Sequence, residues 1–494
     1  MRFLLSYINI NKLIKPKNFG AHRIRLFCSK IAAVNEKKLN INGNLYDRDS
    51  WTNVTPHILS KLNRNLHTNP KHPLGIIVAR IKDFFYNNYR KPTGSPIFSI
   101  YDNISPIVTV RQNFDDLLIG EDHICRQHSD TYYINSGTLL RSHTSAHEAD
   151  LIRSGLDAFL ILGDVYRRDE IDMTHYPVFH QVEGVRLFTR YQVDYSDWRY
   201  NSNGFVALAI AIQGGIFPLL RTLTNITSII QYLQLFKNLP ENDPIVDQFI
   251  LAGKSLRLNA DCRQANSQER HGELTAKTLE MELKSTLEKL AGHLFGKEIN
   301  YRWVPAYFPW THPSFELEIE VAPDVWMEML GCGIIEQDML DKCGAQDRVG
   351  IAFGLGLERW AMKLFDIPDI RAFWSTDPGF LNQFNTDDIH MPIKYKPISV
   401  FPPVYMDISF WLPDPCVRDF HNNDFYELVS SIAGDLVERV EILDKFEDQK
   451  RQRISHCYRI VYRHMSRNLT LKEINIVHSK VSQEVQNQLC CVIR

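Results

Sequence analysis

Residues 163–183, GDVYRRDEIDMTHYPVFHQVE, decide how the rest of the chain is interpreted. Two extended segments, residues 163–168 and 178–185, flank a polar stretch that is rich in turn-forming residues. Strand-like runs joined by such a stretch are typical of an antiparallel hairpin with a long loop. We therefore expect an antiparallel hairpin here.

The polar side chains of this hairpin indicate the ligands that it binds. Arg167 and Arg168 carry planar guanidinium groups, which bind phosphate oxygens in a bidentate manner. Gln181 and Glu183 lie two residues apart on the second strand, so they share one face and can contact the same small ligand. Glu183 can hold an ammonium group. The hairpin is therefore predicted to bind an anion and an amine together.

The composition is that of an ordinary globular protein with two to four domains. The chain has 494 residues, of which 44% are hydrophobic and 23% are charged. The formal net charge of −2 gives no overall attraction to nucleic acid, so such binding would use local basic patches. The nine cysteines are scattered without a C-x-x-C pair, which predicts a reducing compartment and no structural zinc.

The N-terminal segment is basic and contains no acidic residue before Glu36. Its lysines and arginines are interspersed with apolar residues, a pattern typical of an organelle presequence. A disordered basic arm is the alternative. We assign residues 1–45 to a presequence and N-terminal extension.

Residues 204–220, GFVALAIAIQGGIFPLL, are almost entirely apolar. Their length is near the lower limit for a membrane span, but Gln213, two glycines and Pro218 interrupt the run. A buried or membrane-associating hairpin, a partner-binding insert, or sequence absent from the mature protein would each produce this pattern. We favour an insert outside the core fold at about residues 196–265, and we expect no stable membrane anchoring.

The remainder of the chain up to about residue 359 combines apolar helices with strand-like runs. Three helices are predicted: one begins at Pro73, a second includes Leu151, Leu156 and Phe159, and a third covers residues 275–294. Strands are predicted at residues 97–101, 106–111, 298–308, 314–321, 325–330 and 350–353, and the glycine turn GLGLER at 354–359 opens another helix. Because strands do not alternate regularly with helices, an α+β domain with an antiparallel sheet is indicated.

The C-terminal residues predict a separate module. A polar linker at residues 373–395 precedes the pattern β-α-β-β-α, with a last short strand at 490–493, which is typical of a ferredoxin-like module. Four arginines lie on or beside its third strand, and they predict an RNA-facing surface, with a solvated strand face as the alternative. These are Arg453, Arg459, Arg463 and Arg467.

Several ordered segments together resemble a known family. They include FSIYDNISPIVTVRQNFDDLL, LLRSHTSAHEADL, the hairpin, YFPWTHPSFELEIE, GCGIIEQ, AFGLGLERWAM and SHCYRIVYRHM. The chain resembles the class II aminoacyl-tRNA synthetases, specifically the single-chain mitochondrial phenylalanyl-tRNA synthetases, from about residue 62 to 195 and from 266 to 489. The resemblance implies an α+β fold, with a class II antiparallel sheet flanked by helices and a ferredoxin-like (RRM-like) anticodon-binding domain.

The resemblance also implies an ATP site. Arg167 and Arg359 would be catalytic and would bind the α- and γ-phosphates, while Pro106 corresponds to the proline of the first class motif. Glu328 would lie in the nucleotide–Mg²⁺ region and serve as the metal ligand. The full set of implied ATP-binding residues is Arg167, Asp169, Thr174, His175, Tyr176, Phe179, Glu328 and Arg359.

A phenylalanine site is implied by the same resemblance. Its residues would be His143, Ser145, Ala146, His147, Glu148, Gln181, Val182, Glu183, Phe308, Trp310, Ala352 and Phe353. Phe308 and Trp310 would contact the substrate ring, and Ala352 would leave depth for it. The chain departs from the family at Trp310, which replaces a phenylalanine, and at Glu148, which stands where a glutamine is expected. The apolar insert is a third departure.

The implied activity is ATP-dependent activation of L-phenylalanine and its transfer to the 2′-hydroxyl of tRNA(Phe), in the mitochondrial matrix, by a monomer. Another adenylate-forming ligase on the same fold and a catalytically silent RNA-binding relative are the alternatives. The expected domains are the N-terminal extension at 1–45, a catalytic domain at 46–375, a linker at 376–398 and the anticodon-binding domain at 399–494.

Overall fold

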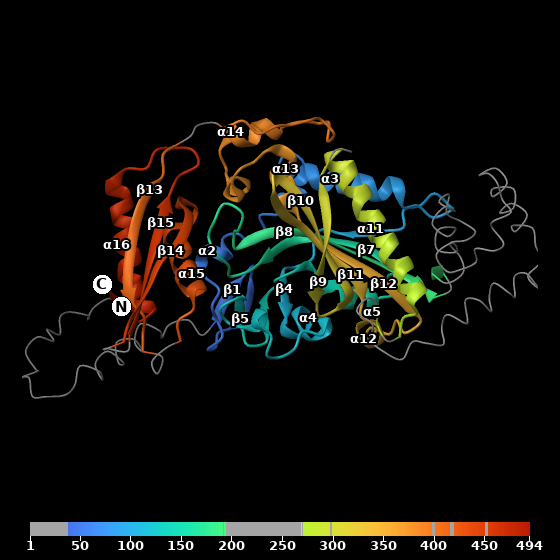
Figure 1. Cartoon of the computed structure of the whole chain (residues 1–494), viewed down its shortest axis with the longest axis horizontal. Helices are drawn as coiled ribbons and strands as arrows, with labels where there is room; N and C mark the ends of the chain where they lie inside the picture. Colours follow the sequence, from blue (N-terminus) through green and yellow to red (C-terminus); the bar gives the residue numbers. More distant parts are fainter. Residues whose placement is uncertain are drawn as a thin grey trace, which may run out of the picture.

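A seven-stranded sheet forms the centre of the N-terminal part of the computed structural model (Figure 1). The structure describes residues 38–190, 192–193, 268, 270–296, 299–397, 401–414, 419–449 and 453–494. The strand order is β3-β7-β8-β12-β11-β10-β9, and every neighbouring pair is antiparallel except β3 and β7. The strands are β3 (Ser99–Tyr101), β7 (Ala158–Tyr166), β8 (Val178–Thr189), β9 (Tyr301–Phe308), β10 (Thr311–Ala322), β11 (Val325–Ile335) and β12 (Arg348–Gly356). The predicted antiparallel sheet is confirmed.

The expected hairpin is β7 and β8 at the middle of this sheet. Tyr166 pairs with Val178 at the closed end, and Ala158 pairs with Arg186 at the other. All nine residues of β7 are buried, because both faces of the sheet are covered. The hairpin is therefore a central element of the core.

Helices α3 (Pro73–Asn88), α11 (Glu273–Phe295) and α13 (Leu357–Phe365) cover one face of the sheet. α3 begins as its sequence predicts, since Pro73 takes the first position and the Nδ1 atom of His72 accepts a hydrogen bond from the Leu74 amide. Figure 1 shows α3 and α11 beside each other over the strands. Their apolar faces and the sheet form one large buried cluster.

Short elements cover the opposite face of the sheet. They are the strands β4 (Ile107–Thr109), β5 (Tyr133–Asn135) and β6 (Thr138–Leu140), and the helices α4 (Val110–Asn113), η5 (Thr144–His147), α5 (Glu148–Arg153) and α12 (Gln337–Lys342). A second apolar cluster lies between them and the sheet. Outside these layers, β1 (Lys38–Ile41), β2 (Asn44–Asp47) and α2 (Pro56–Leu59) precede α3.

Two predicted helix boundaries are wrong. The helix expected through Phe159 ends at Arg153, because Gly155 adopts a left-handed conformation with φ of 85° and the chain turns into β7. The glycine turn expected at residues 354–359 is strand as far as Gly356, because β8 continues to pair with it there. α13 starts only at Leu357.

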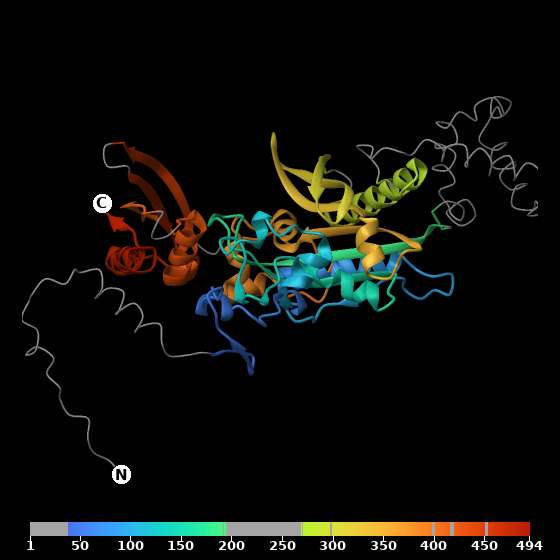
Figure 2. The same cartoon turned by 90° about the horizontal axis from the view of Figure 1, so that it is seen from below.

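The C-terminal part has the predicted ferredoxin-like order. It contains β13 (Val404–Trp411), α15 (Asn422–Ala433), β14 (Val437–Asp448), β15 (Arg453–Tyr462), α16 (Leu471–Gln488) and β16 (Val492–Ile493). The sheet order is β14-β15-β13-β16, and the apolar faces of α15 and α16 pack on it. Figure 2 shows this unit at one end of the molecule.

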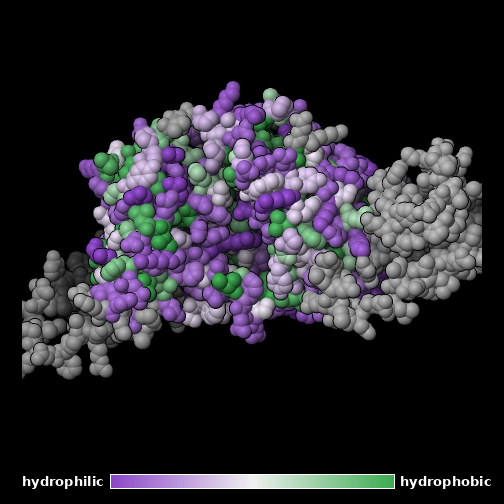
Figure 3. All heavy atoms as spheres, viewed as in Figure 1, coloured by the Kyte–Doolittle hydropathy of each residue, from purple (hydrophilic) through white to green (hydrophobic). Residues whose placement is uncertain are grey.

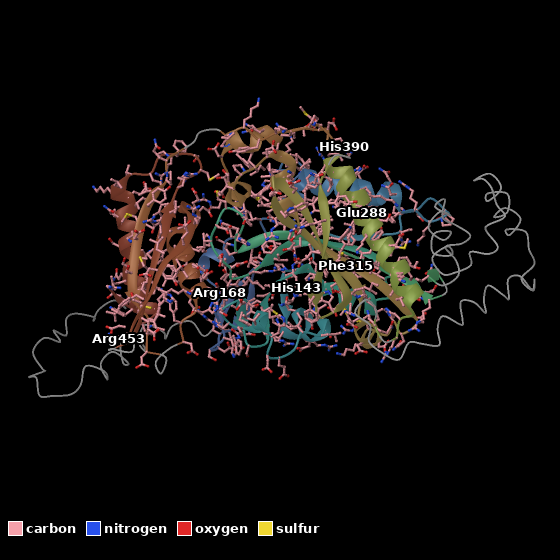
Figure 4. All side chains as sticks on the ribbon, in the orientation of Figure 1. His143, Arg168, Glu288, Phe315, His390 and Arg453 are labelled. Carbon is pink, nitrogen blue, oxygen red and sulfur yellow. The ribbon has the colours of Figure 1, made fainter. Side chains whose placement is uncertain are left out.

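Buried polar contacts join the two parts. Arg168 pairs with Asp424 of α15 at 3.1 Å, and Lys61 pairs with Asp435 at 3.3 Å. Figure 4 shows Arg168 at this junction. Arg371, whose side chain is 1% exposed, pairs with Asp369 at 2.7 Å and donates to the carbonyl oxygens of Asp435 and Arg463. The interface therefore contains charged groups of which most are shielded from water, while the carboxylate of Asp435 is half-exposed.

The segment expected to be a polar linker is partly packed. It contains α14 (Pro378–Leu381), and it buries Phe384 against Phe365 of α13 and Phe380 against Phe384. The domain boundaries given above remain predictions. Residues 1–37 of the predicted N-terminal extension and the whole of the expected apolar insert lie outside the described residues. Among the helices that the structure describes, none has the length and apolar character to cross a membrane.

Replacement of Arg371 by methionine tests the interface. The variant leaves the buried carboxylate of Asp369 without its cation, a change that typically costs about 3–5 kcal/mol. Urea unfolding followed by tryptophan fluorescence should show a clear loss of stability. Arg467→Met is the control, because the exposed Arg467–Glu473 pair should contribute less than about 1 kcal/mol. Equal effects of the two variants would contradict the structural role of Arg371.

Candidate active site

The structure brings most of the predicted site residues to one side of the sheet, along β8, β12 and β11. β8 supplies Gln181 and Glu183, and β12 supplies Ala352. His143 lies near the middle of this part of the molecule (Figure 4). The remaining groups come from η5, the β9–β10 turn, the loop after β7, β11 and α13; they are Ser145, Phe308, Trp310, Arg167, Glu328 and Arg359.

One wall of the site is built around Glu183. Its Oε2 atom accepts hydrogen bonds from Ser145 Oγ at 2.8 Å and from Thr144 Oγ1 at 3.2 Å. The backbone amide of Thr144 donates to Gln181 Oε1 at 3.3 Å. Gly354 lies opposite Glu183 in the β8–β12 ladder, and a Cβ atom there would lie only 3.0 Å from Glu183 Oε2. This wall can bind an ammonium group.

An aromatic wall stands beside it. The rings of Phe308 and Trp310 have centroids 5.9 Å apart and are tilted by 40°. Trp310 also stacks on His143 at 5.4 Å. A Cβ atom on Gly331 would lie 2.6 Å from Phe308 Cζ, so glycine is what allows the ring to lie on the sheet. Together with buried Ala352, these rings can enclose an apolar side chain.

Two arginines form the anion-binding end of the site. Arg167 donates from Nε to the carbonyl oxygen of Ser142 at 2.8 Å, and its guanidinium lies over the Phe179 ring at 5.2 Å. Arg359 donates from Nη1 to Glu328 Oε2 at 3.1 Å. Burial lowers the pKa of Arg167, which also feels the charges of Asp169, Glu328 and Arg359, so the two arginines share one site.

The loop between β7 and β8 is folded around Asp172. Its Oδ1 atom accepts from the amides of Thr174 and His175 at 2.6 and 2.7 Å. Its Oδ2 atom lies 2.8 Å from His175 Nδ1. The hydrogen bond to Asp172 raises the pKa of His175, and the charges of Asp169 and Arg359 reach the same ring. The loop thus holds a histidine beside the arginine pair.

Burial controls protonation in the wall that surrounds Glu183. It raises the pKa of Glu183 to about 7 and the pKa of Glu148 well above its ordinary value. Burial, reinforced by Arg167, lowers the pKa of His143 to about 3, so this ring is neutral. The wall therefore contains a neutral histidine and two carboxyl groups whose pKa values are raised by burial.

Four predicted side chains do not reach the site. Val182 and Phe353 lie on the opposite face, because side chains alternate along a strand; Phe353 stacks on Phe85 of α3 at 5.9 Å. Tyr176 is buried at the interface between the two parts, with its hydroxyl 2.6 Å from Asp435 Oδ1. His147 lies against Arg141, with its Nε2 atom 3.0 Å from Arg141 Nη1.

Other predicted residues lie close to the site, but their contacts are with neighbouring protein groups. Ala146 is buried in the apolar cluster that also contains Ala352. Asp169 is exposed after β7 and acts on Arg167 through its charge. The hydroxyl of Thr174 donates to Asp172 at 2.9 Å, so it helps to fold the loop.

Sequence reasoning missed several residues that shape the site. They are Thr144, the carbonyl of Ser142, the loop residue Asp172, and the glycines Gly331 and Gly354. The glycines had a signal, since a glycine inside a strand marks a close approach of another group. Asp172 had one as well, because aspartate is favoured where a side chain accepts from the backbone two residues further on. Thr144 and Ser142 had none beyond their place next to His143.

Acidic groups near Arg359 could hold a cation. Glu328 of β11 lies opposite Glu318 of β10 in the ladder between these strands. Glu316 of β10 is near enough for the charge of Glu328 to affect its pKa. Burial raises the pKa of Glu316, and the charge of Glu328 raises it further. In the described part of the chain, no three histidine, cysteine or acidic side chains gather as a metal cluster. One or two carboxylates are what Mg²⁺ takes from a protein when phosphates supply its other ligands.

The arginines predicted to face RNA mostly form ion pairs. Arg459 makes a bidentate contact with Asp407 of β13 at 2.8 and 2.9 Å. Arg463 pairs with Glu438 at 2.9 Å, next to the interface between the two parts, and Arg467 pairs with a glutamate of α16. Arg453 is exposed at the start of β15, at the lower end of this unit in Figure 4. The face drawn in Figure 3 is mostly hydrophilic over the middle of the molecule.

Two family profiles match this chain. One is described as tRNA synthetases class II core domain (F) and matches residues 59–200 and 219–384; the other is the ferredoxin-fold anticodon binding domain and matches residues 399–494. The first match continues through residues 219–265, most of the stretch for which an insert was expected, and leaves out only 201–218. The fold, the arginine pair and these profiles define a class II aminoacyl-tRNA synthetase.

Curated relatives narrow the class. The chain is 45% identical to "Phenylalanine--tRNA ligase, mitochondrial" of Mus musculus, over 95% of this chain and 93% of that protein. It is 46% identical to the "Probable phenylalanine--tRNA ligase, mitochondrial" of Drosophila melanogaster, over 90% of each. The "Phenylalanine--tRNA ligase, mitochondrial" of Saccharomyces cerevisiae is 35% identical, over 98% of this chain and all of that protein. The chain belongs to the family of mitochondrial phenylalanine–tRNA ligases.

The Asp172→Asn variant tests the electrostatics of the β7–β8 loop. Because a negative charge at Asp172 raises the pKa of His175, its removal should lower that pKa toward or below the ordinary histidine value. His175 would then lose its proton at a lower pH. An NMR titration of histidine-labelled protein, with a His175→Gln sample for assignment, measures this. An unchanged His175 pKa would contradict the contact.

Proposed function

We propose that this protein charges tRNA(Phe) with L-phenylalanine at the expense of ATP. The observation that carries the proposal is the placement of three surfaces on one side of the sheet. These are the acidic wall at Gln181 and Glu183, the apolar pocket of Phe308, Trp310 and Ala352, and the arginine pair. An amino acid with an aromatic side chain would satisfy the first two while its carboxylate points toward the third.

Activation takes place between the arginines. The phenylalanine carboxylate oxygen attacks the α-phosphorus of ATP, the new O–P bond forms, and the bond to the bridging oxygen of pyrophosphate breaks. Arg167 stabilises the charge that develops on the α-phosphate, and Arg359 binds the γ-phosphate. Phe179, which already lies under Arg167, offers a face for the adenine ring. No side-chain nucleophile is needed, since positioning and charge stabilisation carry the step.

The residues near Arg359 fit a magnesium ion. Glu328, with Glu316 beside it, would hold Mg²⁺ together with the phosphates, and this pair of carboxylates supplies the hard oxygen ligands that the ion prefers. When bound, the ion neutralises charge on the pyrophosphate leaving group. Arg359 remains available for the same purpose because its ion pair with Glu328 is only partly buried.

Transfer completes the reaction. The 2′-hydroxyl of the terminal ribose of tRNA(Phe) attacks the carbonyl carbon of phenylalanyl-adenylate, and AMP leaves. The C-terminal unit supplies the anticodon contact through basic side chains on or just after its third strand, which are Arg453, Arg459, Arg463 and Arg467. We further propose that the protein works as a monomer in the mitochondrial matrix, and that residues 1–45 direct it there.

Loss of Arg167 tests activation. Arg167→Ala should reduce phenylalanine-dependent exchange of pyrophosphate into ATP by at least about a hundredfold, because it removes the cation at the α-phosphate. Arg302→Ala is a matched control, since Arg302 is exposed and pairs with Glu318 near the open end of the β9–β10 hairpin, away from the turn that carries Trp310. Circular dichroism confirms that both variants fold. Full exchange by Arg167→Ala would overturn its role, and exchange with another amino acid in place of phenylalanine would overturn the substrate assignment.

Replacement of Arg453 tests the RNA surface. If this side chain contacts one phosphate, Arg453→Ala should weaken tRNA(Phe) binding and reduce the slope of log K against log salt concentration by about 0.7–0.9. Filter binding at several salt concentrations measures the slope. Lys472→Ala on α16, on the helix side of the module, should leave the slope unchanged. A slope unaffected by Arg453→Ala would exclude that contact.

A further inference from the structure

Glu148 is a buried carboxyl group with no donor of its own. It is the first residue of α5, and its side chain is completely shielded from water. Neither carboxylate oxygen has a hydrogen-bond donor among the described residues. A buried carboxylate without donors is costly, and such groups take up a proton or bind a cation instead.

The carboxyl group of Glu148 meets that of Glu183. The two carboxyl groups act on each other, because the charge of Glu183 raises the pKa of Glu148, and Ser145 acts on both. Ser145 Oγ donates to Glu183 Oε2, so its single proton serves Glu183. Two buried carboxyl groups that act on each other repel when both are ionised, and a proton on one of them removes this repulsion. The burial of both groups and the lack of a donor at Glu148 therefore favour one proton between Glu148 and Glu183.

Few other charges reach Glu148. Glu183 of β8 and the thiol of Cys343 at the end of α12 face it, and Arg167 acts on Glu183. The nearby Arg141 is occupied by Asp164, whose Oδ1 atom lies 3.1 Å away, and by His147. Two ionised carboxylates would thus place a second negative charge in this pocket with little to balance it.

We propose that Glu148 and Glu183 share one proton in the empty site, and that the ammonium group of L-phenylalanine displaces it when the amino acid binds. This inference rests on the proposed function. The ammonium group brings three N–H donors to oxygens that lack them, together with the positive charge that two carboxylates need. The proton leaves for solvent, no covalent bond changes, and the buried charge stays balanced by one cation.

Glu148 stands where a glutamine is expected, and this difference is what allows the ammonium group to displace a proton. A glutamine amide would donate permanently to Glu183 and would hold no titratable proton. Glutamate can donate only while protonated, so it couples amino-acid binding to pH. Glu148 is therefore a positioning residue, and its role is recognised by the pH dependence of amino-acid binding.

Proton release on binding is the direct test. Calorimetric titration of the full chain with L-phenylalanine near pH 7, in two buffers of different ionisation enthalpy, gives the number of protons released. The native protein should release up to one proton, and its dissociation constant should fall by up to about tenfold per pH unit between about pH 6 and pH 8. Glu148→Gln should release none, while Glu121→Gln, an exposed control, should match the native protein. Native protein without release, or equal release by Glu148→Gln, would overturn the proposal.

A second measurement does not depend on binding. Folding raises the pKa of this pair, so the native protein loses stability as pH rises from the ordinary carboxyl range through the raised value, whereas glutamine loses none. The thermal midpoint of Glu148→Gln relative to native should therefore increase from about pH 5 to about pH 8. A difference that is flat with pH would overturn the shared proton. Native pyrophosphate exchange with phenylalanine tests the proposed function separately: its absence would overturn that function, while exchange without proton release would overturn only this inference.

Discussion

The antiparallel pairing of β8 with β12 is the constraint on which the rest of the structure depends. It sets Glu183 opposite Gly354 and Val185 opposite Ala352, so one face of the pair carries the polar wall and the floor of the pocket. The other face carries Val182, Gly184 and Phe353, which pack under α3. A shift of one residue would exchange these faces and would bury the acidic wall under the helices. Register and site are therefore fixed by the same ladder.

This arrangement lets a sheet that is buried on both faces carry charged groups. Glu183 is satisfied by hydroxyls from η5, Arg167 by a backbone carbonyl, and Arg359 by Glu328. Each of these partners comes from a different element, so the polar site forms only when the layers have packed. Glycine makes the approaches possible: at Gly184, a Cβ atom would lie 2.1 Å from Cζ of Phe353. The site thus depends on the absence of a side chain at these glycines as well as on the side chains that line it.

Much of this could be predicted from the sequence, because it follows from local patterns. The β7–β8 hairpin, α3 and the β-α-β-β-α module have strong turn, capping or periodic signals. The placement of Gln181 and Glu183 follows from the alternation of side chains along a strand. The same alternation directs Val182 and Phe353 away from the site to which the family resemblance assigns them. Tyr176 could not be placed, since its partner Asp435 is 259 residues away in sequence.

The loop after β7 shows why neighbouring residues can have different purposes. Arg167 turns toward Phe179 and the arginine-lined end of the site, while Arg168 turns toward Asp424 of the C-terminal unit. The backbone carbonyl of Ile171 accepts a hydrogen bond from the Val440 amide, so β14 also holds this loop. One loop thus contacts both the nucleotide end of the site and the unit that is expected to bind RNA. Because Arg168 follows Arg167 directly in the chain, we expect a change in the packing of the C-terminal unit to reach the backbone that positions Arg167.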